Sequence, residues 1–306
     1  MASMELNCRE LKSRARKHMR ASRPPFWLVT LIYLLLTTGI STAANLLDAA
    51  YISFSPSPED TIPLFLTLLI TLYTTVLEFG YQLWALKTYR QQQPGLGTLI
   101  DGFSMAGRVL ILELIILVNT VAWSLLWSIP ISLLVSLLIP YLSPFAVSLA
   151  YAILLQGLVH VVSYRYLLAP FLLMDRPEAG PFAAVRESVF QMRGWKGQFF
   201  RLDLTFLGWY VLNVCLALGV GMAFDLSAYL ELLTMEFIDP VSVLWGPALP
   251  GIAVLLSSLI QVPISLWLLP YRAVSCAGFY QLRVQQPSPP PPVWESYDGP
   301  YDGPDL

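Results

Sequence analysis

The stretch MDRPEAGPFAAVRESVFQMRGWKGQFF, residues 174–200, lies between two long apolar runs and is the most polar segment in the middle of the chain. A small soluble domain, an active-site loop and a helix on a membrane surface are the alternatives. Apolar residues recur in it at helical spacing, with polar residues largely on the opposite side: Phe182, Val185, Val189 and Met192 against Arg186, Glu187, Gln191 and Arg193. Pro181 and Gly194 are typical boundaries of such a helix. The stretch is too short for a soluble domain and has no nucleophile–base pair, so we predict an amphipathic helix in the headgroup plane.

The rest of the chain has the composition of a membrane protein. Of its 306 residues, 56% are hydrophobic and only 12% are charged. Soluble domains usually carry about 25% charged residues. Several apolar runs exceed the roughly 18 to 20 residues that a helix needs to cross a bilayer. The composition therefore predicts an all-α polytopic membrane protein.

Six transmembrane helices are predicted, each bounded by charge or by Pro and Gly. They are Phe26–Leu47, Ile62–Leu86, Val109–Ile139, Phe145–Met174, Phe199–Phe224 and Leu249–Leu282. The third, fourth and sixth are longer than a bilayer requires, so they must tilt, kink or extend into water. Prolines available for kinks are Pro130, Pro170, Pro263 and Pro270. The chain thus divides into a basic arm (1–25), a six-helix membrane domain (26–283) and a tail (284–306).

Positive charge alternates along the connections between these spans. Lysines and arginines occupy residues 9–23, 87–108 and 176–201, whereas the other connections carry acids such as Glu59, Asp60, Asp225, Glu236 and Asp239. Short cytoplasmic loops collect Lys and Arg. We therefore expect both termini to be cytoplasmic, and anionic lipids to gather at the basic face.

The first span has a second interpretation. The basic arm, the apolar run FWLVTLIYLLL (26–36) and the small residues ISTAAN (40–45) loosely resemble a secretory signal peptide. The basic region is long for that role and the apolar run continues with two leucines. A retained helix is the interpretation that we favour, and cleavage is the alternative.

The amphipathic pattern occurs three times, each time before an apolar hairpin. LGTLIDGFSMAGRVL (96–110) offers an apolar stripe of Leu96, Leu99, Ile100 and Phe103, and CRELKSRARKHM (8–19) offers Cys8, Leu11, Ala15 and Met19. Tyr81-Gln82, Tyr164-Arg165 and Tyr271-Arg272 fall at similar places in spans two, four and six. A threefold repeat of one interfacial amphipathic helix plus one helical hairpin is one interpretation. The other is that Tyr and Arg are simply common near membrane interfaces.

Three segments resemble a known family. RELKSRARKHM (9–19), APFLLMDRP with AVRESVFQMRGWKGQFFRLDLTFLGW (169–209) and LWLLPYRAVSCAGFYQL (266–282) are similar to the opening, central and closing signatures of domain-of-unknown-function family 975. The matching positions are Arg9, Glu10, Leu11, Lys12, Ala15, Pro170, Asp175, Pro177, Ser188, Met192, Gly194, Phe206, Gly208, Trp209, Pro270, Tyr271, Phe279 and Tyr280. Between Gly221 and Trp267 the chain is longer than the family's pattern. The resemblance implies a multi-pass protein of the bacterial cytoplasmic (plasma) membrane, with no assigned reaction and no catalytic residues.

Ionisable groups inside the predicted spans are the candidate site residues. Burying a charge in hydrocarbon costs several kcal/mol unless it is paired or hydrated. The groups are Glu78, Glu113, His160, Arg165, Asp203 and Arg272. The five charged groups would lie in the cytoplasmic half of the membrane, with His160 deeper, and together they could form one polar network around a cavity. Alternatively, each side chain snorkels to the interface or only fixes helix packing.

Other chemistry has little support. The three cysteines, Cys8, Cys215 and Cys276, form no metal-binding pattern, so we expect free thiols and neither a metal nor a cofactor. No nucleic-acid partner is expected.

The leading hypothesis is a non-enzymatic protein that binds or moves a small molecule, lipid or peptide. A scaffold is the alternative, with the Pro-rich acidic tail QQPSPPPPVWESYDGPYDGPDL (285–306) binding a protein partner, and a membrane-embedded enzyme comes third.

Overall fold

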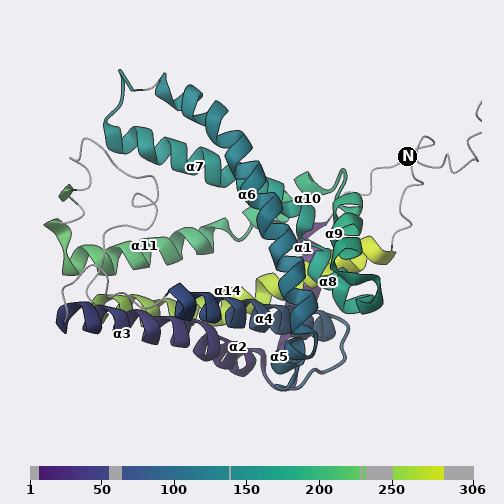
Figure 1. Cartoon of the computed structure of the whole chain (residues 1–306). Coiled ribbons are helices and arrows are strands. Elements are labelled where there is room, and N and C mark those ends of the chain that lie inside the picture. The colour runs from purple at the N-terminus through teal and green to yellow at the C-terminus, as the bar shows by residue number, and fades with distance from the viewer. Residues whose placement is uncertain (1–6, 55–63, 138, 228–229, 232–250, 286–306) are drawn as a thin grey trace, which may run out of the picture.

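The computed structural model describes residues 7–54, 64–137, 139–227, 230–231 and 251–285 (Figure 1). Every regular element in these ranges is a helix. Nearly all of the predicted tail and most of the acidic loop at 225–246 lie outside the described residues.

Along the chain, short helices alternate with long apolar helices. The first group is α1 (Cys8–Arg20), the continuous α2 (Phe26–Leu34), π-helical η1 (Leu35–Gly39) and α3 (Ile40–Phe54), then α4 (Leu64–Tyr89). The second is α5 (Thr98–Asp101), η2 (Gly102–Met105), α6 (Ala106–Ser136) and α7 (Pro144–Ser163). The third is η3 (Tyr164–Tyr166), α8 (Ala169–Asp175), η4 (Pro177–Ala179), α9 (Gly180–Gln191), α10 (Lys196–Leu204), α11 (Leu207–Phe224) and α14 (Gly251–Gln285).

Five stretches among the described residues are long and apolar enough to cross a membrane. They are Phe26–Leu47, Thr98–Ser136, Pro144–Asp175, Leu207–Phe224 and Gly251–Val284. α4, which carries the predicted second span, is not among the five. A count of six therefore stays a prediction.

One predicted span begins later in the structure, and another keeps its predicted ends but is interrupted. α10 ends at Leu204 and α11 begins at Leu207, so the fifth span does not start at Phe199, and Asp203 lies on α10. The buried side chain of Phe206 holds the break between these helices. The fourth predicted span also contains a break, because α7 ends at Ser163 and a separate α8 carries Pro170 near its start. Proline has no N–H to donate and disfavours a helical residue before it, which accounts for the interruption.

The molecule has one packed end and several diverging arms (Figure 1). Short helices α1, α5, α8, α9 and α10 gather at one end, which we call the basic end, and α3, the α6–α7 hairpin and α11 extend away from it. All 18 lysines and arginines of the chain lie on the segments that form or adjoin this end. The arms expose large apolar side chains such as Leu125, Ile129 and Leu133. Exposed apolar surface of this extent is typical of contact with lipid rather than water.

The hydrophobic core occupies the basic end. Its largest fully buried side chains include Trp84 of α4, Phe199 of α10 and Tyr280 of α14. Leu11, Ala15 and Met19 of α1 are buried in it, as the amphipathic pattern predicts. Packing these short helices into one core ties the ends of the long helices together.

The other two amphipathic stripes differ from the prediction. On α9, Val185 and Met192 are buried but Phe182 is 72% exposed, because α9 packs against α8 and α6. In the predicted stripe at 96–103 only Leu99 is buried, because the helix there is only four residues long before it tightens into η2. α9 therefore packs one face into the helical core, and its position in the headgroup plane stays a prediction.

The three tyrosines at the span exits have similar environments. Tyr81, Tyr164 and Tyr271 are each less than 5% exposed. Each hydroxyl has a polar partner, at Thr30, Asp203 and Arg16 in turn. The threefold repeat of an amphipathic helix plus a helical hairpin stays a prediction.

Helices α4 and α5 approach one another unusually closely. A Cβ added at Gly80 would lie 2.1 Å from the carbonyl oxygen of Leu99, and one at Gly102 would lie 2.8 Å from that of Val76. Only glycine permits two backbones to come this near. The contact fixes the position of the segment of α4 that carries Glu78, Tyr81 and Gln82.

Candidate binding cavity

A partly open cavity of about 280 Å³ lies between α4, α6, α8 and α14, near the basic end. Its lining combines aromatic and apolar walls with a small number of polar groups, which is typical of ligand sites. The lining residues are Tyr33, Glu78, Tyr81, Gln82, Glu113, Ile116, Ser163, Tyr166, Leu167, Pro170, Phe171, Leu269, Arg272, Ala273 and Cys276. We call this space the polar cavity.

Three of the six candidate residues line the polar cavity. Glu78 comes from α4, Glu113 from α6 and Arg272 from α14. In the part of the chain that the structure describes, neither glutamate has a Lys or Arg partner within 4.0 Å. The side-chain amide of Gln82 donates to Oε1 of Glu78 over 3.5 Å. Two carboxylates thus face one cavity without a cation of their own.

Arg272 forms an ion pair with Asp203, which does not line the cavity. Its Nε lies 3.3 Å from Oδ1 of Asp203. Oδ2 of the same carboxylate lies 2.9 Å from Nε2 of His160 and accepts a 2.9 Å hydrogen bond from the hydroxyl of Tyr164. The Asp203 side chain is only 11% exposed. This hub joins α7, η3, α10 and α14, and its carboxylate compensates the charge of Arg272.

Arg165 takes a different direction from the other candidates. Its guanidinium lies 4.9 Å from the centre of the Trp123 ring on α6, and the residue does not line the polar cavity. Its backbone carbonyl accepts a hydrogen bond from the Ser188 hydroxyl. The structure therefore separates Arg165 from Glu78 and Glu113, with which the sequence grouped it.

Sequence reasoning missed Gln82 as a lining residue. Its Oε1 is buried and has no hydrogen-bond partner among the described residues. A buried unsatisfied acceptor costs about 1–3 kcal/mol, and a ligand or water is a usual explanation for one. Its position four residues after Glu78, on the same face of α4, was the available signal.

Several family-signature residues form a clasp at the basic end, outside the polar cavity. Arg90 donates two hydrogen bonds, of 2.8 and 2.6 Å, to the carboxylate of Asp175. The hydroxyl of Tyr280 donates to the same carboxylate over 2.7 Å. The bidentate geometry is the strongest arrangement of this pair. Through it, the ends of α4, α8 and α14 are joined.

Other signature positions stabilise the local backbone. Ser188 is fully buried; its hydroxyl donates to the Arg165 carbonyl and accepts from the Leu168 amide, which bridges the break before α8. The carbonyl of Pro177 accepts from Arg108. Gly194 has a φ of +77°, a conformation that favours glycine. The other central and closing positions are the buried Pro170, Met192, Phe206, Pro270, Tyr271 and Phe279, and the exposed Gly208 and Trp209.

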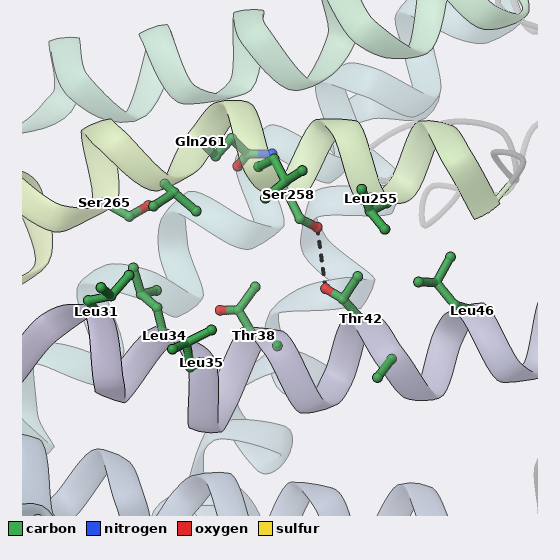
Figure 2. A pocket seen from close by; sticks show the side chains of 14 residues that line it. Leu31, Leu34, Leu35, Thr38, Thr42, Leu46, Leu255, Ser258, Gln261 and Ser265 are labelled. Atoms are coloured by element: carbon green, nitrogen blue, oxygen red, sulfur yellow. Dashed lines mark hydrogen bonds between the residues drawn. The ribbon is translucent and has the colours of Figure 1, made fainter.

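A second space, the lateral groove, lies between α2–η1–α3 and α14 (Figure 2). Its volume is about 380 Å³, and leucine is the commonest residue in its walls. The hydroxyls of Thr42 and Ser258 lie 3.3 Å apart across it. Thr38 and Gln261 also line it, and the π-helical turn η1 forms part of one wall. Such turns are frequent at functional sites.

The described residues contain no cluster of three or more His, Cys, Asp or Glu that could hold a metal ion. All three cysteines are free thiols.

Comparison with known families gives one match. The model of the family described as "Protein of unknown function (DUF975)" matches residues 4–286. The chain belongs to this family. The match extends from α1 to the end of α14. No curated protein and no solved structure shows a significant match.

Proposed function

We propose that this DUF975 protein is a non-enzymatic membrane protein that binds or moves a small ligand through the polar cavity. The ligand carries a cationic or hydrogen-bond-donating group. The observation that supports this proposal is the convergence of Glu78, Glu113 and the unsatisfied Oε1 of Gln82 on one space. Among the described residues, neither glutamate has a cationic partner and Oε1 of Gln82 accepts no hydrogen bond, whereas Arg272 is already compensated by Asp203.

A charge at this depth calls for a partner. Carboxylates within a membrane are costly unless they are paired, and they commonly mark substrate or ion pathways. A ligand ammonium between Glu78 and Glu113 would supply the missing positive charge, and an N–H group could donate to Gln82. The aromatic rings of Tyr33 and Phe171 would contact its apolar part.

The proposal includes six spans, with α4 as the second. Its 26 residues would extend about 39 Å at 1.5 Å per residue, more than the roughly 30 Å of a bilayer core. The 18 lysines and arginines lie on the segments that form or adjoin the basic end, which supports an orientation with that end, the polar cavity and both chain termini on the cytoplasmic side of a plasma membrane. With this orientation, a membrane-impermeant maleimide should label the half-exposed Cys8 only after the cells are permeabilised. Labelling of Cys8 in intact cells would show that the protein has the opposite orientation.

The test of the ligand proposal is native mass spectrometry of the gently solubilised protein from its own membrane. The wild-type protein should retain a discrete small molecule. The variant Glu78→Gln/Glu113→Gln should lose it, because the exchange removes both charges and hardly changes side-chain volume.

Two control variants separate the cavity from general effects of charge. Glu178→Gln removes a carboxylate that is exposed on η4, and it should keep the ligand. Arg165→Ala should also keep it, because Arg165 does not line the cavity. If the double variant retains the ligand at the wild-type level, the cavity has no part in binding. Loss in all variants would indicate damage to the fold.

The alternative is a membrane scaffold that binds proteins through its surface helices and Pro-rich tail. It predicts that deletion of residues 286–306 abolishes function, whereas the ligand proposal predicts little effect. Burial of α1 and α9 in the core reduces the helical surface that such a scaffold could offer.

A further inference from the structure

A third space, which we call the cationic pocket, lies where α1 crosses α14 at the basic end. It has a volume of about 370 Å³. It is lined by Cys8, Arg9, Lys12, Ser13 and Arg16 of α1, Thr205 after α10, and Tyr271 of α14. These residues come from three segments far apart in sequence, so the pocket exists only in the folded protein.

The cations of this pocket have neutral partners. Nζ of Lys12 donates to Oγ1 of Thr205 over 2.8 Å, and Nη2 of Arg16 donates to the hydroxyl of Tyr271 over 3.2 Å. Arg9 is exposed and has no hydrogen bond or ion pair in the described part of the chain. Three positive charges therefore line one pocket, and no described salt bridge compensates them.

The acids closest in sequence on the described segments are engaged elsewhere. Glu10 pairs with Arg14 on another face of α1, and both carboxylate oxygens of Asp203 contact the hub. Burial, and secondly the neighbouring Arg16, lower the pKa of Lys12. Keeping these cations together is thus unfavourable in the empty pocket, and a bound anion would relieve the repulsion.

The donors fit one class of anion. Guanidinium groups bind phosphate oxygens in a bidentate manner, lysine adds a point charge, and hydroxyls can donate to the remaining oxygens. Arg9, Lys12 and Arg16 offer the charged donors, and Ser13 adds a hydroxyl. Thr205 lies two residues before Leu207, where α11 and a candidate membrane span begin. A cationic pocket beside the end of a span would be within reach of anionic lipid headgroups.

We propose that the cationic pocket binds a phosphate group, carried either by a phospholipid headgroup or by a soluble phosphate ester. This site is separate from the polar cavity and does not depend on the proposed function. It also explains why Arg9 and Lys12, two positions of the family's opening signature, share one face of α1 while Leu11 enters the core.

The experiment uses the full-length protein in nanodiscs. In the lipid arm, native mass spectrometry counts phosphatidylglycerol molecules retained against phosphatidylcholine as its fraction is increased. In the soluble arm, calorimetry in phosphatidylcholine nanodiscs measures binding of inorganic phosphate and of glycerol 3-phosphate. Retention in the first arm identifies a headgroup site, and saturable binding in the second identifies a soluble phosphate ester.

The matched variants are Lys12→Gln and Lys17→Gln, which remove the same charge from two sides of one helix. Lys17 is exposed and does not line the pocket. Lys12→Gln should weaken binding about five-fold, the effect expected of one lysine near a phosphate, and Lys17→Gln less than two-fold. Arg9→Gln, which breaks no described contact, should match Lys12→Gln and so excludes a folding defect. Equal losses in the Lys12 and Lys17 variants would show only a diffuse basic surface, and absence of binding in both arms would overturn the proposal.

Discussion

The close approach of α4 and α5 gives the sharpest prediction, because one chemical change should have opposite effects at two glycines. In Gly80→Ala the new methyl would lie 2.1 Å from the Leu99 carbonyl oxygen and 2.8 Å from its carbonyl carbon. Ordinary C···O contacts begin near 3.3 Å. Both neighbouring atoms are backbone, so no side-chain rotation can relieve the overlap. The helices must separate by about 1 Å, the difference between these distances.

Separation of the helices would loosen the packing around Leu99, which is 1% exposed, and at Gly102, where α4 and η2 meet. Overpacking of this kind costs about 1–3 kcal/mol and occasionally more. Against this, alanine has a higher helix propensity than glycine, which stabilises the helix by up to about 1 kcal/mol. Since the overlap is with rigid backbone, we expect a net loss of about 2 kcal/mol in the free energy of unfolding.

Gly157→Ala is the control. Gly157 lies within α7, and an added Cβ would meet nothing within 4 Å. The same methyl should be neutral or should stabilise by up to about 1 kcal/mol. The assay is unfolding in mixed micelles titrated with sodium dodecyl sulfate and followed by circular dichroism. Equal stabilities of the two variants would refute the close contact between α4 and α5.

Further predictions use the same assay. Ser188→Ala should cost roughly 2–4 kcal/mol, because it leaves the buried Leu168 amide and the Arg165 carbonyl each without its hydroxyl partner. Ser132→Ala, which removes a hydroxyl that bonds only within its own helix, should change stability by less than about 0.5 kcal/mol; a loss at Ser188 no larger than this would contradict the bridging role. In the clasp, Asp175→Asn should cost about 1–2 kcal/mol, since it removes the charge that Arg90 contacts twice, and Tyr280→Phe should cost less because it removes one hydrogen bond. The reverse order for these two variants would mean that packing, and not the ion pair, holds the clasp.

The sequence alone determined the class of the protein. Apolar runs longer than a bilayer, combined with Lys and Arg confined to a few connections, indicate an all-helical membrane protein. The buried face of α1 could also be predicted, because Leu11, Ala15 and Met19 follow helical spacing and the helix is long enough to keep one side apolar. The family motifs could be recognised because they are local.

Only the tertiary structure decided which polar groups meet. Glu78, Glu113 and Arg272 face one cavity, whereas Arg165 turns to Trp123, although all four are ionisable residues in apolar helices. Periodicity gives the face of a helix but not its neighbour, and contacts such as Arg90 with Asp175 join residues 85 positions apart. The helices are also interrupted near Pro170 and at Thr205, and each interruption is only a few residues long. A hydropathy average over a whole span does not detect a break that short. Such long-range partners depend on how the helices pack at the basic end, and the packing depends on backbone contacts such as that at Gly80.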